Sequence, residues 1–141
     1  MFARELAYRC PDKIRAVVML GSPFSGDYKT NTNIRAFYEW IAGHDVDQPP
    51  FERHRGKPPV PALALWSRRD GICAPAAARG EAGETDKQAE VDTRHTGFAV
   101  DRQALSQMVR EIRDFLTEIE GKPPFPFPQP NMKRGQTRRS A

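Results

Sequence analysis

Residues 61–75 read PALALWSRRDGICAP and place a carboxylate shortly after an apolar run. The run at 61–66 predicts a strand of a parallel sheet that is covered on both faces. It stops at Ser67, and Asp70 follows in a loop that contains glycine. In parallel α/β sheets, functional groups collect at the carboxyl ends of the strands, so Asp70 is a candidate functional residue.

Two further strands and two helices surround this stretch. The run IRAVVML, residues 14–20, predicts a second buried strand, and AEVD, residues 89–92, a third. Helical spacing of apolar residues predicts helices at 1–10 and 101–120, the second with Asp101 as N-cap and Gly121 as its stop. The apolar positions are Phe2, Ala3, Leu6, Ala7 and Cys10 in the first helix, and Leu105, Met108, Val109, Ile112, Phe115, Leu116 and Ile119 in the second. Strands that alternate with helices predict an α/β fold.

Two segments fall outside this pattern. Residues 25–58 form a long insertion between the first two strands, with a short helix expected around Ile34 to Ala42, and we interpret the insertion as a cap. Residues 121–141 contain five prolines and five Lys or Arg residues but no acid. We expect residues 1–120 to form one domain and residues 121–141 to form a disordered tail that is rich in proline and basic residues.

Charge and composition narrow the classes of function. The net charge is +4, and subtracting the five charges of the tail leaves about −1 for residues 1–120. This balance does not favour nucleic acid as a partner. The two cysteines are too few for a disulfide framework, and no run approaches the roughly 18 apolar residues of a membrane span. We therefore expect a cytoplasmic chain with no membrane span, no cofactor and no bound metal.

Asp70 and His95 carry the candidate chemistry. His95 follows the third predicted strand, so both residues are expected at the same edge of the sheet. In a catalytic triad, a buried carboxylate fixes the imidazole tautomer, and the other ring nitrogen takes the proton of the nucleophile. An acid that precedes the base in the chain is the order found in α/β-hydrolases.

Three stretches resemble the C-terminal half of serine α/β-hydrolases of the lipase and esterase type. They are AVVMLGSPFSG at 16–26, PVPALALWSRRDGICAP at 59–75 and VDTRHTGFAVD at 91–101. In this family a G-S-P-like turn ends one strand, the acid lies in an S-x-x-D-G-like loop, and the base often lies in H-x-G. The resemblance implies Asp70 as triad acid, His95 as base, a partial α/β-hydrolase fold with its last three parallel strands, and a carboxylic ester as substrate.

The sequence departs from this family at the nucleophile. No serine has glycine two residues before and two residues after it, so the G-x-S-x-G elbow is absent. We expect a truncated hydrolase with an incomplete triad that is inactive or nearly so alone. The strand at 14–20 would then present an open edge to a protein partner. The alternative function is a non-catalytic α/β binding module.

Other residues offer weaker candidates. Ser22 could replace the missing nucleophile, although a turn serine that bonds local backbone is the simpler interpretation. Cys73 could pair with His95 as a thiolate, although its neighbours favour a small apolar filler.

Three further groups have simple structural explanations. The sequence GHDVD, residues 43–47, offers metal-ligand side chains without a second cluster. The aromatic and apolar residues at 37–41 could line an acyl pocket or pack on the sheet. The basic tail could contact an anionic polymer, and we rank this function last.

Overall fold

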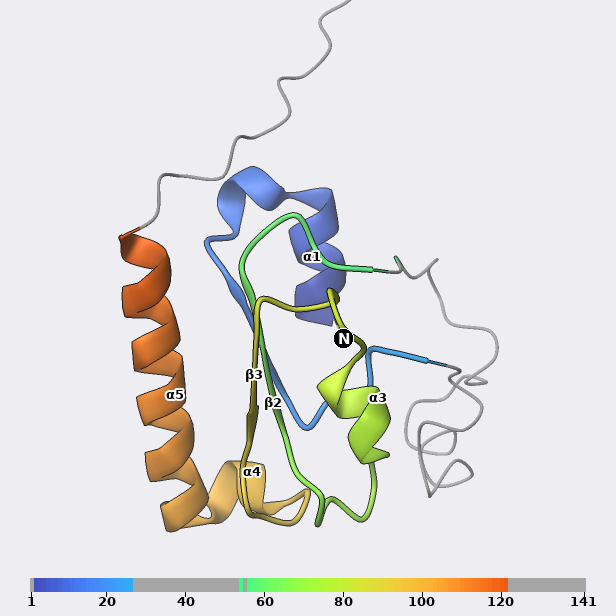
Figure 1. The fold of residues 1–141 in the computed structure, drawn as a ribbon, viewed down its shortest axis with the longest axis vertical. Coiled ribbons are helices and arrows are strands. Elements are labelled where there is room, and N and C mark those ends of the chain that lie inside the picture. Colours follow the sequence, from blue (N-terminus) through green and yellow to red (C-terminus); the bar gives the residue numbers. More distant parts are fainter. Residues whose placement is uncertain (1, 27–53, 55, 122–141) are drawn as a thin grey trace, which may run out of the picture.

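The computed structural model describes residues 2–26, 54 and 56–121 of the chain. Figure 1 labels most of its elements along the chain. In order they are α1 (Phe2–Arg9), a 3₁₀ turn η1 (Pro11–Lys13), β1 (Val17–Leu20), β2 (Ala62–Trp66), α3 (Pro75–Arg79), β3 (Lys87–Glu90), α4 (Gly97–Val100) and α5 (Arg102–Glu120). The predicted helix near 34–42, most of the predicted cap and residues 122–141 lie outside the described residues.

The strands form one parallel sheet in the order β1-β2-β3, which confirms the predicted α/β architecture. Val17 lies opposite Ala62, and Leu63 lies opposite Lys87. Because all three strands run the same way, their carboxyl ends meet at one edge, where α4 lies in Figure 1. This edge is where the sequence places Asp70 and His95.

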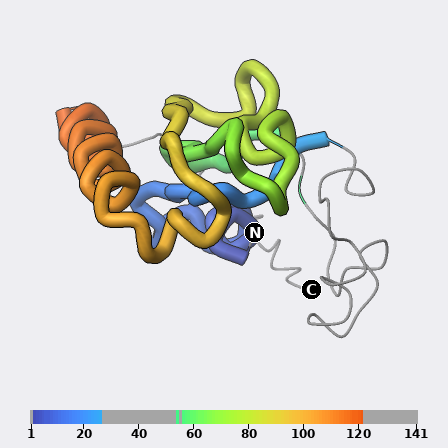
Figure 2. The backbone as a smooth tube through the Cα atoms, turned by 90° about the horizontal axis from the view of Figure 1, so that it is seen from below, coloured from blue at the N-terminus to red at the C-terminus, as the bar shows by residue number. Residues whose placement is uncertain are grey.

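Helices cover both faces of the sheet. On one face, Ala7 of α1 packs with Val17, Met19, Ala62 and Ala64. On the other face, Leu63 and Leu65 pack with Ala104, Met108 and Phe115 of α5. The alternation of faces along β2 follows from the pleat of a strand. Figures 1 and 2 show α5 on one side of the sheet and α1 on the other, so the fold has three layers.

The buried face of α1 differs from the apolar face in the sequence. Of the apolar set only Ala7 is fully buried, while Phe2 and Leu6 are exposed. Arg4 and Glu5 are buried instead. Arg4 donates hydrogen bonds to the backbone oxygens of His54 and Gly56, and Glu5 accepts from the backbone N–H and the ring of His54. Helical spacing could not identify this face, because its partners lie about 50 residues away in the chain.

The third strand begins earlier than the sequence indicated. The prediction of 89–92 is wrong by two residues, because β3 spans Lys87–Glu90. Lys87 and Gln88 carry no apolar signal, since this strand lies at the edge of the described sheet. Val91 still donates a hydrogen bond to the Trp66 oxygen and is fully buried, which explains its apolar character.

The last helix follows its prediction closely at both ends. The Asp101 side chain accepts hydrogen bonds from the backbone N–H groups of Gln103 and Ala104, and the helix ends at Glu120. Met108 and Phe115 are buried, but Leu105 and Val109 are exposed, because the sheet covers a narrower stripe than the apolar spacing implies. Among residues 2–26, 54 and 56–121, no helix is long and apolar enough to cross a membrane.

Candidate active site

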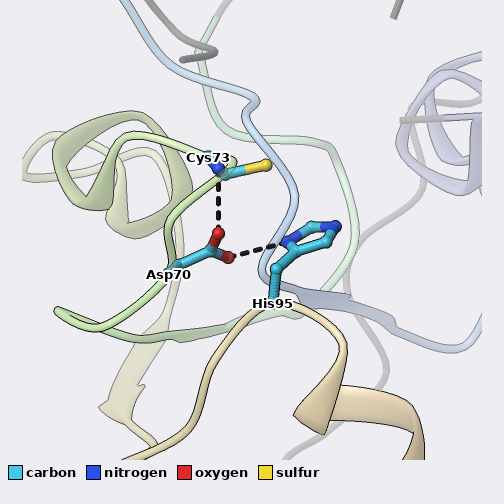
Figure 3. A group of neighbouring side chains, drawn as sticks. All are labelled: Asp70, Cys73 and His95. Atoms are coloured by element: carbon cyan, nitrogen blue, oxygen red, sulfur yellow. Dashed lines mark hydrogen bonds and ion pairs between the residues drawn. The ribbon is translucent and has the colours of Figure 1, made fainter. Parts of the chain in front are cut away.

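Asp70 and His95 meet at the carboxyl edge of the sheet. The loop after β2 carries Asp70, and the loop after β3 carries His95. Oδ2 of Asp70 lies 2.8 Å from Nδ1 of His95. Figure 3 marks this hydrogen bond with a dashed line. The Asp70 side chain is fully buried, whereas 35% of the His95 side chain is exposed. The structure thus brings together the two residues that the sequence proposed as acid and base.

The other carboxylate oxygen of Asp70 is held by its own loop. Oδ1 accepts hydrogen bonds of 2.9 Å from the backbone N–H groups of Ile72 and Cys73. These bonds compensate for burial of the carboxylate and fix its plane. Because a carboxylate only accepts hydrogen bonds, Nδ1 of His95 is the donor, and Nε2 is left without a proton in the neutral ring. The free Nε2 can therefore accept a proton.

Ser67 connects the two loops, and sequence analysis gave it no role. It is buried, and its hydroxyl donates to the backbone oxygen of Thr93. The same oxygen atom of Ser67 accepts from the backbone N–H groups of Arg69 and Thr93, at 3.0 and 3.4 Å. Its position three residues before Asp70 was the only signal in the sequence. Ser67 fixes the spacing between the loops of the acid and the base.

Two glycines allow this close packing. Gly21, at the end of β1, has a φ of +50°, and a Cβ there would lie 2.7 Å from the Phe98 ring and 3.0 Å from Oδ2 of Asp70. A Cβ on Gly97, two residues after His95, would lie 1.9 Å from Oγ1 of Thr93. The glycines of the G-S-P and H-x-G patterns therefore have steric roles beside the acid and the base.

Cys73 also belongs to this group of side chains. It is buried, and Figure 3 shows its side chain beside Asp70 and His95. Burial, followed by the charge of Asp70, raises the pKa of the Cys73 thiol to about 12. The thiol is therefore protonated at neutral pH and is a poor nucleophile. This environment agrees with the interpretation of Cys73 as a small apolar filler.

The raised pKa of Cys73 predicts a loss of stability in alkali. The ordinary pKa of this thiol is 9.0, so above that pH the unfolded chain releases a proton that the folded chain retains. The free energy of unfolding then falls as pH rises from 9.0 towards about 12. From about pH 8 to about pH 10 we expect wild type to lose about 1 kcal/mol more than Cys73→Ala. Urea unfolding under reducing conditions with EDTA measures this difference, and equal losses would contradict the prediction.

The remaining sequence candidates are placed as follows. Ser22 is half-buried directly after Gly21 at the end of β1. The GHDVD sequence and the aromatic residues at 37–41 lie outside the described residues.

A second histidine–carboxylate pair that the sequence did not indicate joins Nδ1 of His54 to Glu5 at 2.7 Å, with the His54 ring stacked on Tyr8.

The comparisons with known proteins add no relative. No protein-family model matches the chain, and neither a curated protein nor a solved structure shows significant similarity to it.

Proposed function

We propose that Asp70 and His95 are the acid and base of a catalytic triad in a carboxylic ester hydrolase with a partial α/β-hydrolase fold. The observation that carries this proposal is the hydrogen bond between Oδ2 of the buried Asp70 and Nδ1 of His95. Its position at the carboxyl edge of a parallel sheet supports the proposal, as does the order of acid before base.

In the proposed reaction, the oxygen of a hydroxyl group bonds to the carbonyl carbon of the ester while Nε2 of His95 takes the proton of that hydroxyl group. The protonated ring then gives this proton to the departing alkoxide as the ester C–O bond breaks. Asp70 holds the ring and stabilises its positive charge throughout. Water then attacks the new ester in the same two steps, and the carboxylic acid is released. The attacking hydroxyl is not assigned to any serine of the described residues. The test therefore adds an external alcohol that provides the hydroxyl group.

The test adds a small alcohol that can occupy the place of the nucleophile. Trifluoroethanol at low concentration and a short-chain nitrophenyl ester are incubated with the purified chain, and formation of the trifluoroethyl ester is measured. A positioned base contributes about 10²-fold or more to such a step. We expect the product to form faster than without protein, and the excess rate to disappear in His95→Ala.

His54→Gln is the matched control, because it removes the other histidine that bonds a carboxylate. It should retain the excess rate once folding is verified by circular dichroism. An excess rate that survives in His95→Ala, or no excess rate in folded wild type, would overturn the proposed function.

Asp70→Asn tests how the acid acts on the base. Both backbone donors face Oδ1, so the amide oxygen must take that position, and the amide NH₂ must face Nδ1 of His95. The NH₂ group donates, so Nδ1 becomes the acceptor and the proton moves to Nε2. Long-range ¹H–¹⁵N NMR should show this change of tautomer in His95 and none in His54. The excess rate should fall to background. An unchanged His95 tautomer would contradict the proposed role of Asp70.

The open edge of β1 favours a second candidate function, strand pairing between two copies of the chain. The N–H groups of Val17 and Gly21 donate to the backbone oxygens of Pro61 and Leu65. Because alternate residues of a strand direct their backbone groups to opposite sides, those of Val18 and Leu20 point away from β2. Within the described residues no strand lies on that side of β1. Two such edges could pair about a two-fold axis and continue the sheet.

Light scattering after size-exclusion chromatography tests this second function. Wild type should be a dimer, and Leu20→Lys should be a monomer because a lysine on an edge strand disfavours pairing with another strand. Val109→Lys places the same charge on the exposed face of α5 and should remain a dimer. A wild type that is monomeric at high concentration would rule the pairing out.

A further inference from the structure

Three metal-ligating side chains converge at the edge of the sheet. Asp70, Cys73 and His95 each offer one ligand atom, and these atoms all lie within 4.8 Å of one another. The first two residues come from the loop after β2 and the third from the loop after β3, as Figure 3 shows. Among the described residues this is the one group of three or more such side chains, since the Glu5–His54 pair has no third member.

The spacing of these atoms is close to that of a metal site. Two ligands of a tetrahedral zinc ion lie about 2.0–2.3 Å from the metal and therefore about 3.5 Å from each other. A separation of at most 4.8 Å thus requires shifts of about 1 Å. His95 is the most exposed of the three, so its ring has the most room to turn.

The donor set selects the kind of metal. Thiolate and imidazole ligands favour Zn²⁺ and its neighbours in the first transition row, whereas Mg²⁺ and Ca²⁺ prefer sites made of oxygen. Three protein ligands would leave the fourth tetrahedral position open to water. A bound cation also favours the thiolate form of Cys73, which burial alone disfavours.

The surroundings support the ligands from outside. The backbone N–H groups of Ile72 and Cys73 hold Oδ1 of Asp70, which leaves Oδ2 directed towards His95. Hydrogen bonds of this kind fix the orientation of metal ligands in known sites. The partly exposed His95 ring gives an ion a route from solvent, while the other two ligands are buried.

We propose that Asp70, Cys73 and His95 together bind a zinc-like divalent transition-metal ion. This proposal does not rest on the proposed hydrolase function, because it needs only the three side chains. The two proposals compete for His95. A ring nitrogen that binds the metal ion cannot also accept a proton. We therefore expect Zn²⁺ to inhibit any reaction in which His95 is the base.

Cobalt spectroscopy and zinc calorimetry test the site directly, without an activity assay. Co²⁺ added to the metal-free, reduced full chain should give one equivalent of visible absorption bands typical of tetrahedral coordination, with a thiolate-to-cobalt charge-transfer band in the near ultraviolet. Added Zn²⁺ should displace these bands. In calorimetry, Zn²⁺ affinity should fall about 100-fold or more in Cys73→Ser and His95→Asn, since each removes a direct ligand.

Three controls cover the other thiol and the other imidazoles of the chain. Cys10→Ser removes the other thiol, and His44→Asn and His54→Gln remove the other imidazoles. All three should retain the cobalt bands and the zinc affinity, with folding of every variant verified by circular dichroism. The proposal is overturned if folded wild type gives no thiolate–cobalt band, or if the band survives in folded Cys73→Ser. It is also overturned if a control variant loses the band.

Discussion

Replacing Phe115 by alanine should lower the free energy of unfolding by about 3–5 kcal/mol, the range for deletion of a buried aromatic side chain. Phe115 is 1% exposed and packs with Leu63 and Leu65 across the interface between α5 and the sheet. The cavity would open where α5 covers β2, and the helix has few other large side chains that are fully buried. Because small domains have only about 5–15 kcal/mol of stability, the variant should be largely unfolded in mild urea.

Val109→Ala is the matched control on the same helix. Val109 is 64% exposed, so its truncation should change the free energy of unfolding by no more than about 0.5 kcal/mol. Urea titrations followed by circular dichroism compare the two variants. A cost below about 1 kcal/mol for Phe115→Ala would show that α5 does not pack on the sheet as described.

Gly21→Ala should be nearly as damaging, and its effect should reach the site. The positive φ of +50° costs an alanine about 1–2 kcal/mol. The new methyl group would also overlap the Phe98 ring and press on Oδ2 of Asp70, and overpacking of this kind costs about 1–3 kcal/mol. The two costs together give about 2–5 kcal/mol, with a weakened bond between Asp70 and His95.

Two glycines elsewhere separate the causes. Gly71 lies next to Asp70, but a Cβ there meets no atom within 4 Å and its φ is not positive. Gly71→Ala should therefore leave the free energy of unfolding nearly unchanged. Gly83 has a φ of +87° with open space around it, so Gly83→Ala should show the backbone cost alone. NMR of the His95 Nδ1–H proton reports on the site. If Gly21→Ala leaves this signal unchanged and costs no more than Gly83→Ala, the steric explanation is wrong.

Much of the framework could be predicted from local patterns. The apolar runs located β1 and β2, because strands covered on both faces need continuous apolar residues. The Asp101 cap and the spacing of Met108 and Phe115 located α5. The short helices α3 and α4 were not predicted, since four or five residues are too few to show helical periodicity.

The sequence by itself indicated that Asp70 and His95 each follow a strand of a parallel sheet, so that both lie at the same edge. Only the tertiary structure decided that these residues touch, that Ser67 ties their loops together and that Cys73 joins the group. It also decided that Arg4 and Glu5 are buried while Phe2 is exposed. The physical reason is the range of each interaction. Caps and periodicity act within a few residues, whereas burial of a polar side chain depends on partners that the fold brings from distant parts of the chain.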